Sequence, residues 1–178
     1  MANPKLSTQG FTLIELLVVI IIIGILSAIA LPSFLNQANK AKQAEAKQYL
    51  AAINKAQQAY YLENDEFVDN VSEIGKLGIG IRPETANYSY ELAPLGGGQG
   101  VVAIAEPSEE SSSVKGYVSA VGLVYQPGGS DPTTLSVVCE SEGIGSDARL
   151  SVSNIQFTLG SVSSAGDVSC GEQTVAVK

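Results

Sequence analysis

The sequence has no histidine and no tryptophan, and it has one methionine among 178 residues. Histidine is the commonest general base and metal ligand of proteins, so its absence removes the usual centre of acid–base catalysis and metal binding. Basic residues are also few: ten, against eighteen acidic ones, give a formal net charge of -8. A protein that reads nucleic acid needs a basic face, so we expect no direct nucleic-acid site.

Cysteine is nearly as scarce: the sequence contains two, Cys139 and Cys170. They lie too far apart for a CxxC redox motif, and two cysteines without histidine cannot complete a structural zinc site. A disulfide is the simpler interpretation if the C-terminal part lies outside the cytoplasm. It would close a loop of about 30 residues and contribute on the order of 3.5 kcal/mol. The alternative is two unrelated buried thiols.

Residues with catalytic potential are present but isolated. Serine and aspartate residues occur without a base beside them, so no nucleophile–base pair can be proposed. The carboxylates of Glu109 and Glu110 stand in a serine-rich run, which is typical of a solvated loop. We therefore expect that the chain is not an enzyme and needs neither a cofactor nor a metal ion.

One long apolar run dominates the N-terminal part. It extends from Phe11 to Leu31, and Glu15 is its single charge. As a helix it would be about 31 Å long, which matches the hydrocarbon core of a bilayer. A buried core helix, a plain membrane anchor and a secretory signal peptide all compete as interpretations. In the last case Ala28-Ile29-Ala30 would be the signal-peptidase site, and cleavage there would release a soluble binding domain.

Two features favour a more specific role. A carboxylate inside the apolar run costs a few kcal/mol at membrane depth, so Glu15 needs a reason to be there. Helical spacing also continues beyond the run, so Phe11 to Leu62 predicts one helix of roughly 78 Å. Gly24 and Pro32 should weaken this helix and produce a kink or loosening between them. The apolar positions that continue the pattern are Phe34, Ala38, Ala41, Tyr49, Ile53, Ala56 and Tyr60.

The N-terminus resembles the class III signal of type IV prepilins and pseudopilins. The resemblance rests on Lys5 and on the segment from Gln9 to Ile20, which reads QGFTLIELLVVI. It implies cleavage after Gly10 by a membrane prepilin peptidase and N-methylation of the new terminus at Phe11. It also implies that Glu15 pairs with the Phe11 amine of a neighbouring subunit.

The same resemblance implies a function and a location. The chain would be a structural subunit of a type IV pilus or related pseudopilus, and its partners would be other pilin subunits, the prepilin peptidase and an inner-membrane assembly platform. The precursor would cross the inner membrane once, with its head outside the cytoplasm, before joining an extracellular pilus or periplasmic pseudopilus. Charge does not itself give this orientation, because Lys5 on one flank opposes three lysines on the other, Lys40, Lys42 and Lys47.

Beyond the helix, four segments rich in β-forming residues alternate with turn signals. They predict an α+β fold in which a sheet of about four antiparallel strands packs on the helix. The helix face should be Tyr49, Ile53, Ala56 and Tyr60. The expected strands are Tyr88–Leu92, Gly100–Ala105, Gly116–Tyr125 and Thr133–Cys139. The expected parts are a leader at 1–10, a membrane and assembly segment at 11–35, an amphipathic segment at 36–62 and a β-rich head at 63–178.

The remaining segments read as loops. Acidic residues at 63–69 predict a solvated loop after the helix, and the glycines from Gly75 to Gly80 should continue it. Residues Glu140 to Gly171 are rich in glycine and serine, so irregular structure is expected there, with one strand near Leu150 to Leu159.

Overall fold

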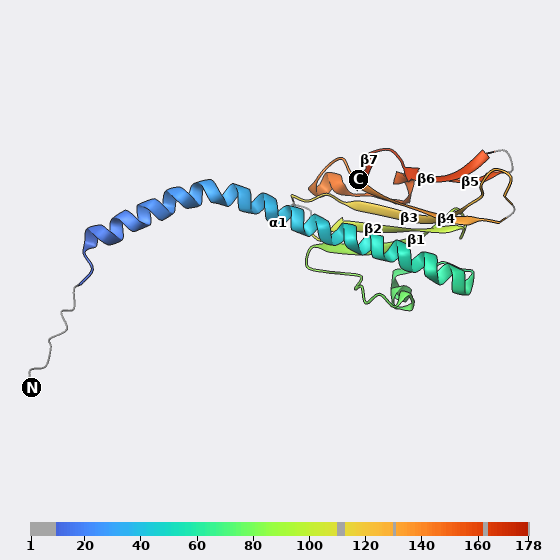
Figure 1. Cartoon of the computed structure of the whole chain (residues 1–178), viewed down its shortest axis with the longest axis horizontal. Coiled ribbons are helices and arrows are strands. Elements are labelled where there is room, and N and C mark those ends of the chain that lie inside the picture. The colour runs from blue at the N-terminus through green and yellow to red at the C-terminus, as the bar shows by residue number, and fades with distance from the viewer. Residues whose placement is uncertain (1–9, 110–112, 130, 162–163, 178) are drawn as a thin grey trace, which may run out of the picture. The chain divides into compact units, whose positions relative to one another are not determined.

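The computed structural model describes residues 10–109, 113–129, 131–161 and 164–177 (Figure 1). The chain forms two compact units, Met1–Ala38 and Asn39–Lys178. One α-helix, α1, runs from Leu13 to Asn64 and contributes to both units. Its bounds lie two residues later at each end than the sequence predicts. Of the predicted leader, only Gly10 falls within the described residues.

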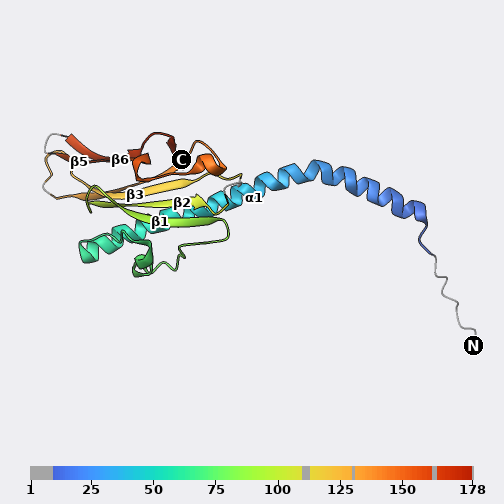
Figure 2. The ribbon, with the colours of Figure 1, turned by 180° about the vertical axis from the view of Figure 1, so that it is seen from behind.

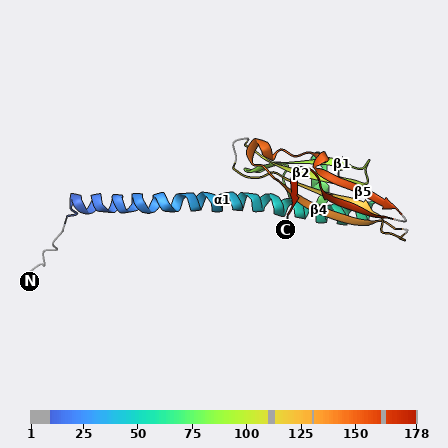
Figure 3. The same ribbon diagram turned by 90° about the horizontal axis from the view of Figure 1, so that it is seen from above.

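In the first unit, α1 has no protein partner. Every side chain from Phe11 to Gln37 is exposed, although nearly all of them are apolar as far as Leu35. A helix that is apolar all round belongs in a low-dielectric environment rather than on a water-covered surface. It is long and apolar enough to cross a membrane. Gly24 and Pro32 lie inside α1, which Figure 3 draws as a continuous helix, and the predicted weakening between them remains a prediction about the assembled subunit.

The second unit has three layers. Its centre is a five-stranded antiparallel sheet in the order β1-β2-β3-β4-β7. The part of α1 after Asn39 covers one face, and a separate hairpin of β5 and β6 covers the other (Figures 1 and 2). The strands are β1 Tyr88–Leu95, β2 Gly100–Pro107, β3 Tyr117–Val124, β4 Thr133–Ser141, β5 Ile155–Ser161, β6 Ser164–Cys170 and β7 Thr174–Ala176. The four predicted strands are confirmed as β1 to β4.

Strict alternation along the central strands gives the sheet two buried faces. In β2, Val101 and Ala103 pack in the cluster under the helix, whereas Val102 and Ile104 pack in the cluster under the hairpin. On the helix side, Ile53 is fully buried, and three further residues pack around it, as predicted: Tyr49, Ala56 and Tyr60. The tight connection between β1 and β2 uses three successive glycines with φ of 60°, 72° and 97°, Gly96, Gly97 and Gly98. Such positive values are accessible to glycine at no steric cost.

Two sequence-based expectations are wrong. Residues Glu140 to Gly171 are not mainly irregular, because the hairpin β5–β6 lies within them and only part of the expected strand is formed. The segment after the acidic loop is not all loop either, since Val71–Leu77 forms a 3-10 helix, η1. Tertiary burial explains η1: Ile74 and Leu77 enter the core, and the Asn70 side chain accepts a hydrogen bond from the Ser72 N–H.

Two buried polar side chains lock α1 into the second unit. Asn54 donates to the Val137 carbonyl at 3.2 Å and accepts from the Ser119 hydroxyl at 2.9 Å. Gln57, fully buried, holds both backbone groups of Val68: its Nε2 donates to the carbonyl at 2.6 Å, and its Oε1 accepts from the N–H at 3.0 Å. Because buried polar groups must be paired, the Asn54 bonds fix the position of α1 on strands β3 and β4, and the Gln57 bonds hold α1 against the segment that follows it.

Replacing Gln57 with alanine should destabilise the second unit by about 2–3 kcal/mol, because it leaves both Val68 backbone groups buried without partners. The measurement is urea unfolding of the full chain in detergent, followed by the near-ultraviolet circular dichroism of its tyrosines. Gln48→Ala, an exposed position on the same helix, is the matched control. Equal unfolding midpoints for the two variants would contradict the assigned role of Gln57.

Candidate functional site

The start of α1 carries a hydrogen-bonded cap made by Thr12 and Glu15. Thr12 precedes the first residue of α1 and Glu15 lies in its first turn. The Glu15 carboxylate accepts from the Thr12 N–H at 2.8 Å and from the Thr12 hydroxyl at 2.6 Å, while the Glu15 N–H donates to the Thr12 hydroxyl at 3.3 Å. This reciprocal arrangement is a capping box, which satisfies orphan donors at a helix start.

The other predicted N-terminal residues lie around this cap or further along the same helix. Gly10 and Phe11 directly precede it and are exposed, with 82% of the Phe11 side chain accessible. An accessible backbone at this junction is what a processing enzyme requires. Gly24 and Pro32 are exposed positions inside α1, and a Cβ added at Gly24 would meet nothing within 4 Å. Gly24 is thus not required for any packing contact within the chain.

The two cysteines form a disulfide that joins the layers of the second unit. Cys139 is in β4 of the large sheet, Cys170 ends β6 of the hairpin, and their Cα atoms are 5.8 Å apart. Cys139 is fully buried in the cluster beneath the hairpin. The bond therefore holds the hairpin on the sheet in addition to its apolar contacts.

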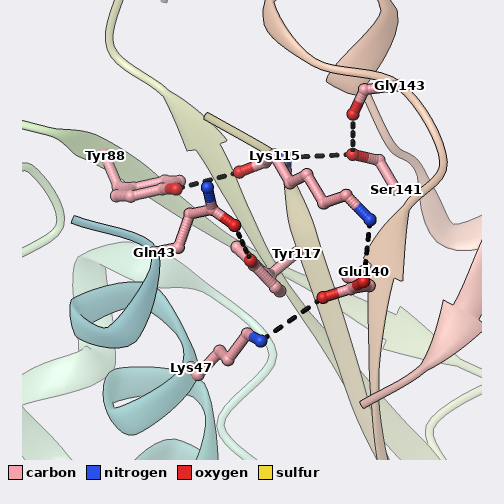
Figure 4. A network of polar contacts seen from close by, with 9 residues as sticks. Gln43, Lys47, Tyr88, Lys115, Tyr117, Glu140, Ser141 and Gly143 are labelled. Carbon is pink, nitrogen blue, oxygen red and sulfur yellow. Dashed lines mark hydrogen bonds and ion pairs between the residues drawn. The ribbon is translucent and has the colours of Figure 1, made fainter. Parts of the chain in front are cut away.

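A polar network connects α1 to the sheet at the start of the second unit (Figure 4). Glu140 lies between two lysines, with Lys115 Nζ 2.7 Å from Oε1 and Lys47 Nζ 3.3 Å from Oε2. Beside it, the Tyr117 hydroxyl donates to Gln43 Oε1 at 2.9 Å, so strand β3 also bonds to the helix. The Lys47 ammonium lies 5.3 Å from the centre of the Tyr117 ring, which adds a cation–π contact.

The network lowers the pKa of its acidic residue, Glu140. Partial burial raises the pKa of Glu140, but the hydrogen bonds and charges of Lys115 and Lys47 outweigh it and hold that pKa below its ordinary value of 4.5. Burial raises the pKa of Tyr117 far above its usual range, so this hydroxyl stays protonated and remains a donor. The arrangement therefore stabilises the attachment of α1 to the sheet.

Sequence reasoning missed several of these residues for different reasons. Thr12 could have been found, because Thr-x-x-Glu before an apolar run is the signature of a capping box. Lys47 and Glu140 could not, since nothing in a single sequence pairs a helix with a strand 93 positions away. Among the described residues, no cluster of three or more acidic or cysteine side chains is arranged to hold a metal ion.

Two families of known proteins match the chain. The type IV pilin-like G and H family matches residues 43–170, and the prokaryotic N-terminal methylation motif matches residues 6–31. The first match covers the second structural unit almost to its end. The second covers the predicted cleavage junction and the apolar part of α1, and it does not favour signal-peptidase cleavage at Ala30.

Individual relatives are similar over shorter stretches. The type IV major pilin protein PilA of Myxococcus xanthus is 43% identical over 96 residues, 53% of this chain and 40% of that protein. The type IV wide pilus major component PilA4 of Thermus thermophilus is 35% identical over 87 residues, 49% and 66% of the two chains. The type II secretion system core protein G of Aeromonas hydrophila is 36% identical over 63 residues, 35% and 44% of the two chains. The matches thus span less than two thirds of each relative.

Acid should weaken the attachment of α1 through Glu140. Because the folded-state pKa of this residue is lowered, its stabilisation is present above pH 4.5 and is lost as the pH falls through the folded-state value. Glu140→Gln should therefore lower the unfolding free energy at pH 7 by about 1 kcal/mol and make little difference at pH 3. Urea unfolding at both pH values measures the difference in unfolding free energy between the wild type and Glu140→Gln, with the exposed Glu142→Gln as control. The same difference at pH 7 and at pH 3 would refute the assigned role of Glu140.

Proposed function

Because the chain belongs to the type IV pilin-like G and H family, we propose that it is a structural subunit of a type IV pilus or a related pseudopilus. The observation that carries the proposal is the segment from Phe11 to Leu35, which is apolar all round apart from a few residues and which no other described part of the chain covers. Apolar area costs about 25 cal/mol per Å² in water, so this surface needs another environment. A bilayer supplies it for the precursor, and neighbouring helices supply it in a filament.

Proteolytic processing would convert the precursor in the bilayer into the subunit that joins a filament. A prepilin peptidase cuts the exposed Gly10–Phe11 bond, and the new Phe11 amine is methylated, as the match to the methylation motif supports. The amine is then the nearest cation available, since the sequence has no lysine or arginine between Lys5 and Lys40. Glu15 can exchange its local cap for the amine of an adjacent subunit. Such a pair contributes little net stability but fixes the register of otherwise featureless helices.

Gly24 and Pro32 have a role in this scheme. Glycine lowers helix propensity, and proline removes one backbone hydrogen bond, so the segment between them is the weakest part of the apolar helix. We expect it to loosen when the subunit enters a filament and to let the filament stretch.

The location follows from the same reasoning. The precursor spans the inner membrane once and holds its disulfide-bonded head on the oxidising side, where such bonds persist. An assembly platform in that membrane would extract it into a surface pilus or a periplasmic pseudopilus. Relatives named as major pilins and as secretion-system proteins support both destinations.

N-terminal sequencing of the mature chain tests the proposal directly. A methylated Phe11 terminus supports a pilin, whereas a Leu31 terminus means secretion of a soluble domain. Sheared surface or periplasmic filaments are then probed for the chain. Its absence from every filament fraction, although it is expressed and processed, would rule out the structural role.

Glu15→Leu should leave cleavage and membrane insertion largely intact and reduce filament incorporation at least about tenfold. The substitution removes the only carboxylate that can pair with a neighbouring amine, while membrane insertion becomes easier. The measurement is the ratio of subunit in sheared filaments to subunit in membranes, in cells without a wild-type copy. Ile14→Leu is the apolar control. Normal incorporation of the Glu15 variant would eliminate the register role.

A further inference from the structure

An apolar groove lies on the outer side of α1 in the second unit. The helix and the segment after η1 form it together, and it encloses about 500 Å³. Its floor is mainly apolar. Its rim carries Lys55, which is exposed on the helix, Glu63 two turns further along, and Lys76, which is paired with Glu73 at 2.9 Å. Nothing in the described chain fills it. The lining residues are Ala52, Lys55, Ala56, Ala59, Tyr60, Glu63, Lys76, Leu77 and Ile79.

A turn with one exposed aliphatic side chain and two carboxylates lies elsewhere on the same unit. It comprises residues 142–147, after β4, and includes the first residues of the 3-10 helix Gly145–Ala148. Ile144, the residue before that 3-10 helix, is 52% exposed. Glu142 and Asp147 flank it and are both exposed. The turn thus presents one apolar side chain between two carboxylates.

The turn is held in shape before any partner arrives. The Ser141 hydroxyl accepts from the Gly116 N–H at 3.1 Å and donates to the Gly143 carbonyl at 2.7 Å (Figure 4). The Gly145 N–H donates to the Val114 carbonyl at 3.2 Å. Gly143 is required here, because a Cβ at that position would lie 2.6 Å from the Asp147 Cβ. A preorganised turn loses little conformational entropy on docking.

We propose that the turn of one subunit docks in the groove of a second copy of this chain. Ile144 would enter the apolar floor, and Glu142 would approach Lys55. This inference rests on the proposed function as a filament subunit.

Within one chain the turn and the groove lie on different parts of the unit. The turn follows Glu140, which is paired with Lys47 on α1, whereas the α1 residues that line the groove run from Ala52 to Glu63. The contact is therefore heterologous, and heterologous contacts that do not close generate open helical filaments.

Engineered cysteines test the contact in the assembled filament. Ala59→Cys combined with Ile144→Cys should give a ladder of disulfide-linked multimers on non-reducing gels of sheared filaments, because bonded cysteines need Cβ atoms about 4 Å apart. Each single variant should give no ladder. Ala59→Cys with Ser89→Cys, an exposed position in β1, is the matched pair, and its crosslink yield should be at least about tenfold lower.

Three outcomes separate this inference from the function on which it rests. A ladder specific to the first pair supports the docking. Filaments that contain the doubly substituted chain without a ladder overturn the docking but leave the subunit role intact. Absence of the unmodified chain from all filaments overturns the subunit role itself.

Charge exchange gives an independent measurement. Lys55→Glu should reduce filament incorporation about threefold to fivefold, because it places like charges against the turn. Adding Glu142→Lys in the same chain should restore incorporation. Lys40→Glu, the same charge change earlier on the helix and outside the groove, is the control. Wild-type incorporation of Lys55→Glu, or no recovery in the double variant, would contradict the proposed pairing.

Discussion

The packing of one helical face onto one sheet face is the constraint on which the second unit depends. Leu50 and Ile53 are completely buried between the two layers, so any rotation of α1 would expose them and bury polar neighbours. Asn54 and Gln57 tighten this constraint, because Asn54 bonds to the Val137 carbonyl of β4 and Gln57 bonds to both backbone groups of buried Val68. Apolar packing selects the face, and these directional bonds select its register. The ion pairs of Glu140 then secure the beginning of the contact.

The same helix meets two different requirements along its length. Before Ala38 its side chains are apolar on all sides and exposed, whereas after Asn39 they divide into a buried face and a solvated face. The backbone hydrogen bonds continue through both parts, so a change in side chains, not in backbone, marks the transition.

The far face of the sheet is stabilised differently. Ile155 and Val168 of the β5–β6 hairpin are buried in the cluster beneath it. The disulfide adds to these contacts, since it constrains the unfolded chain whatever the apolar area. Cys139 occupies a strand position between both layers, so one bond ties the hairpin to the strand that also carries Glu140. The helix and the hairpin are therefore linked through β4.

The sequence by itself determined the features that depend on local or periodic patterns. The apolar run, the helix from Leu13 to Asn64 and strands β1 to β4 all follow from spacing, and Tyr49 and Ile53 marked the helix face correctly. Only tertiary structure decided the features that need distant partners. The glycine- and serine-rich segment forms β5 and β6 because their hairpin packs on the second face of the sheet. The 3-10 helix η1 forms because Ile74 is buried in the core. The continuous apolar run in β2 is buried on both faces of the sheet. What covered the second face depended on contacts between segments far apart in the chain, which local propensity does not encode.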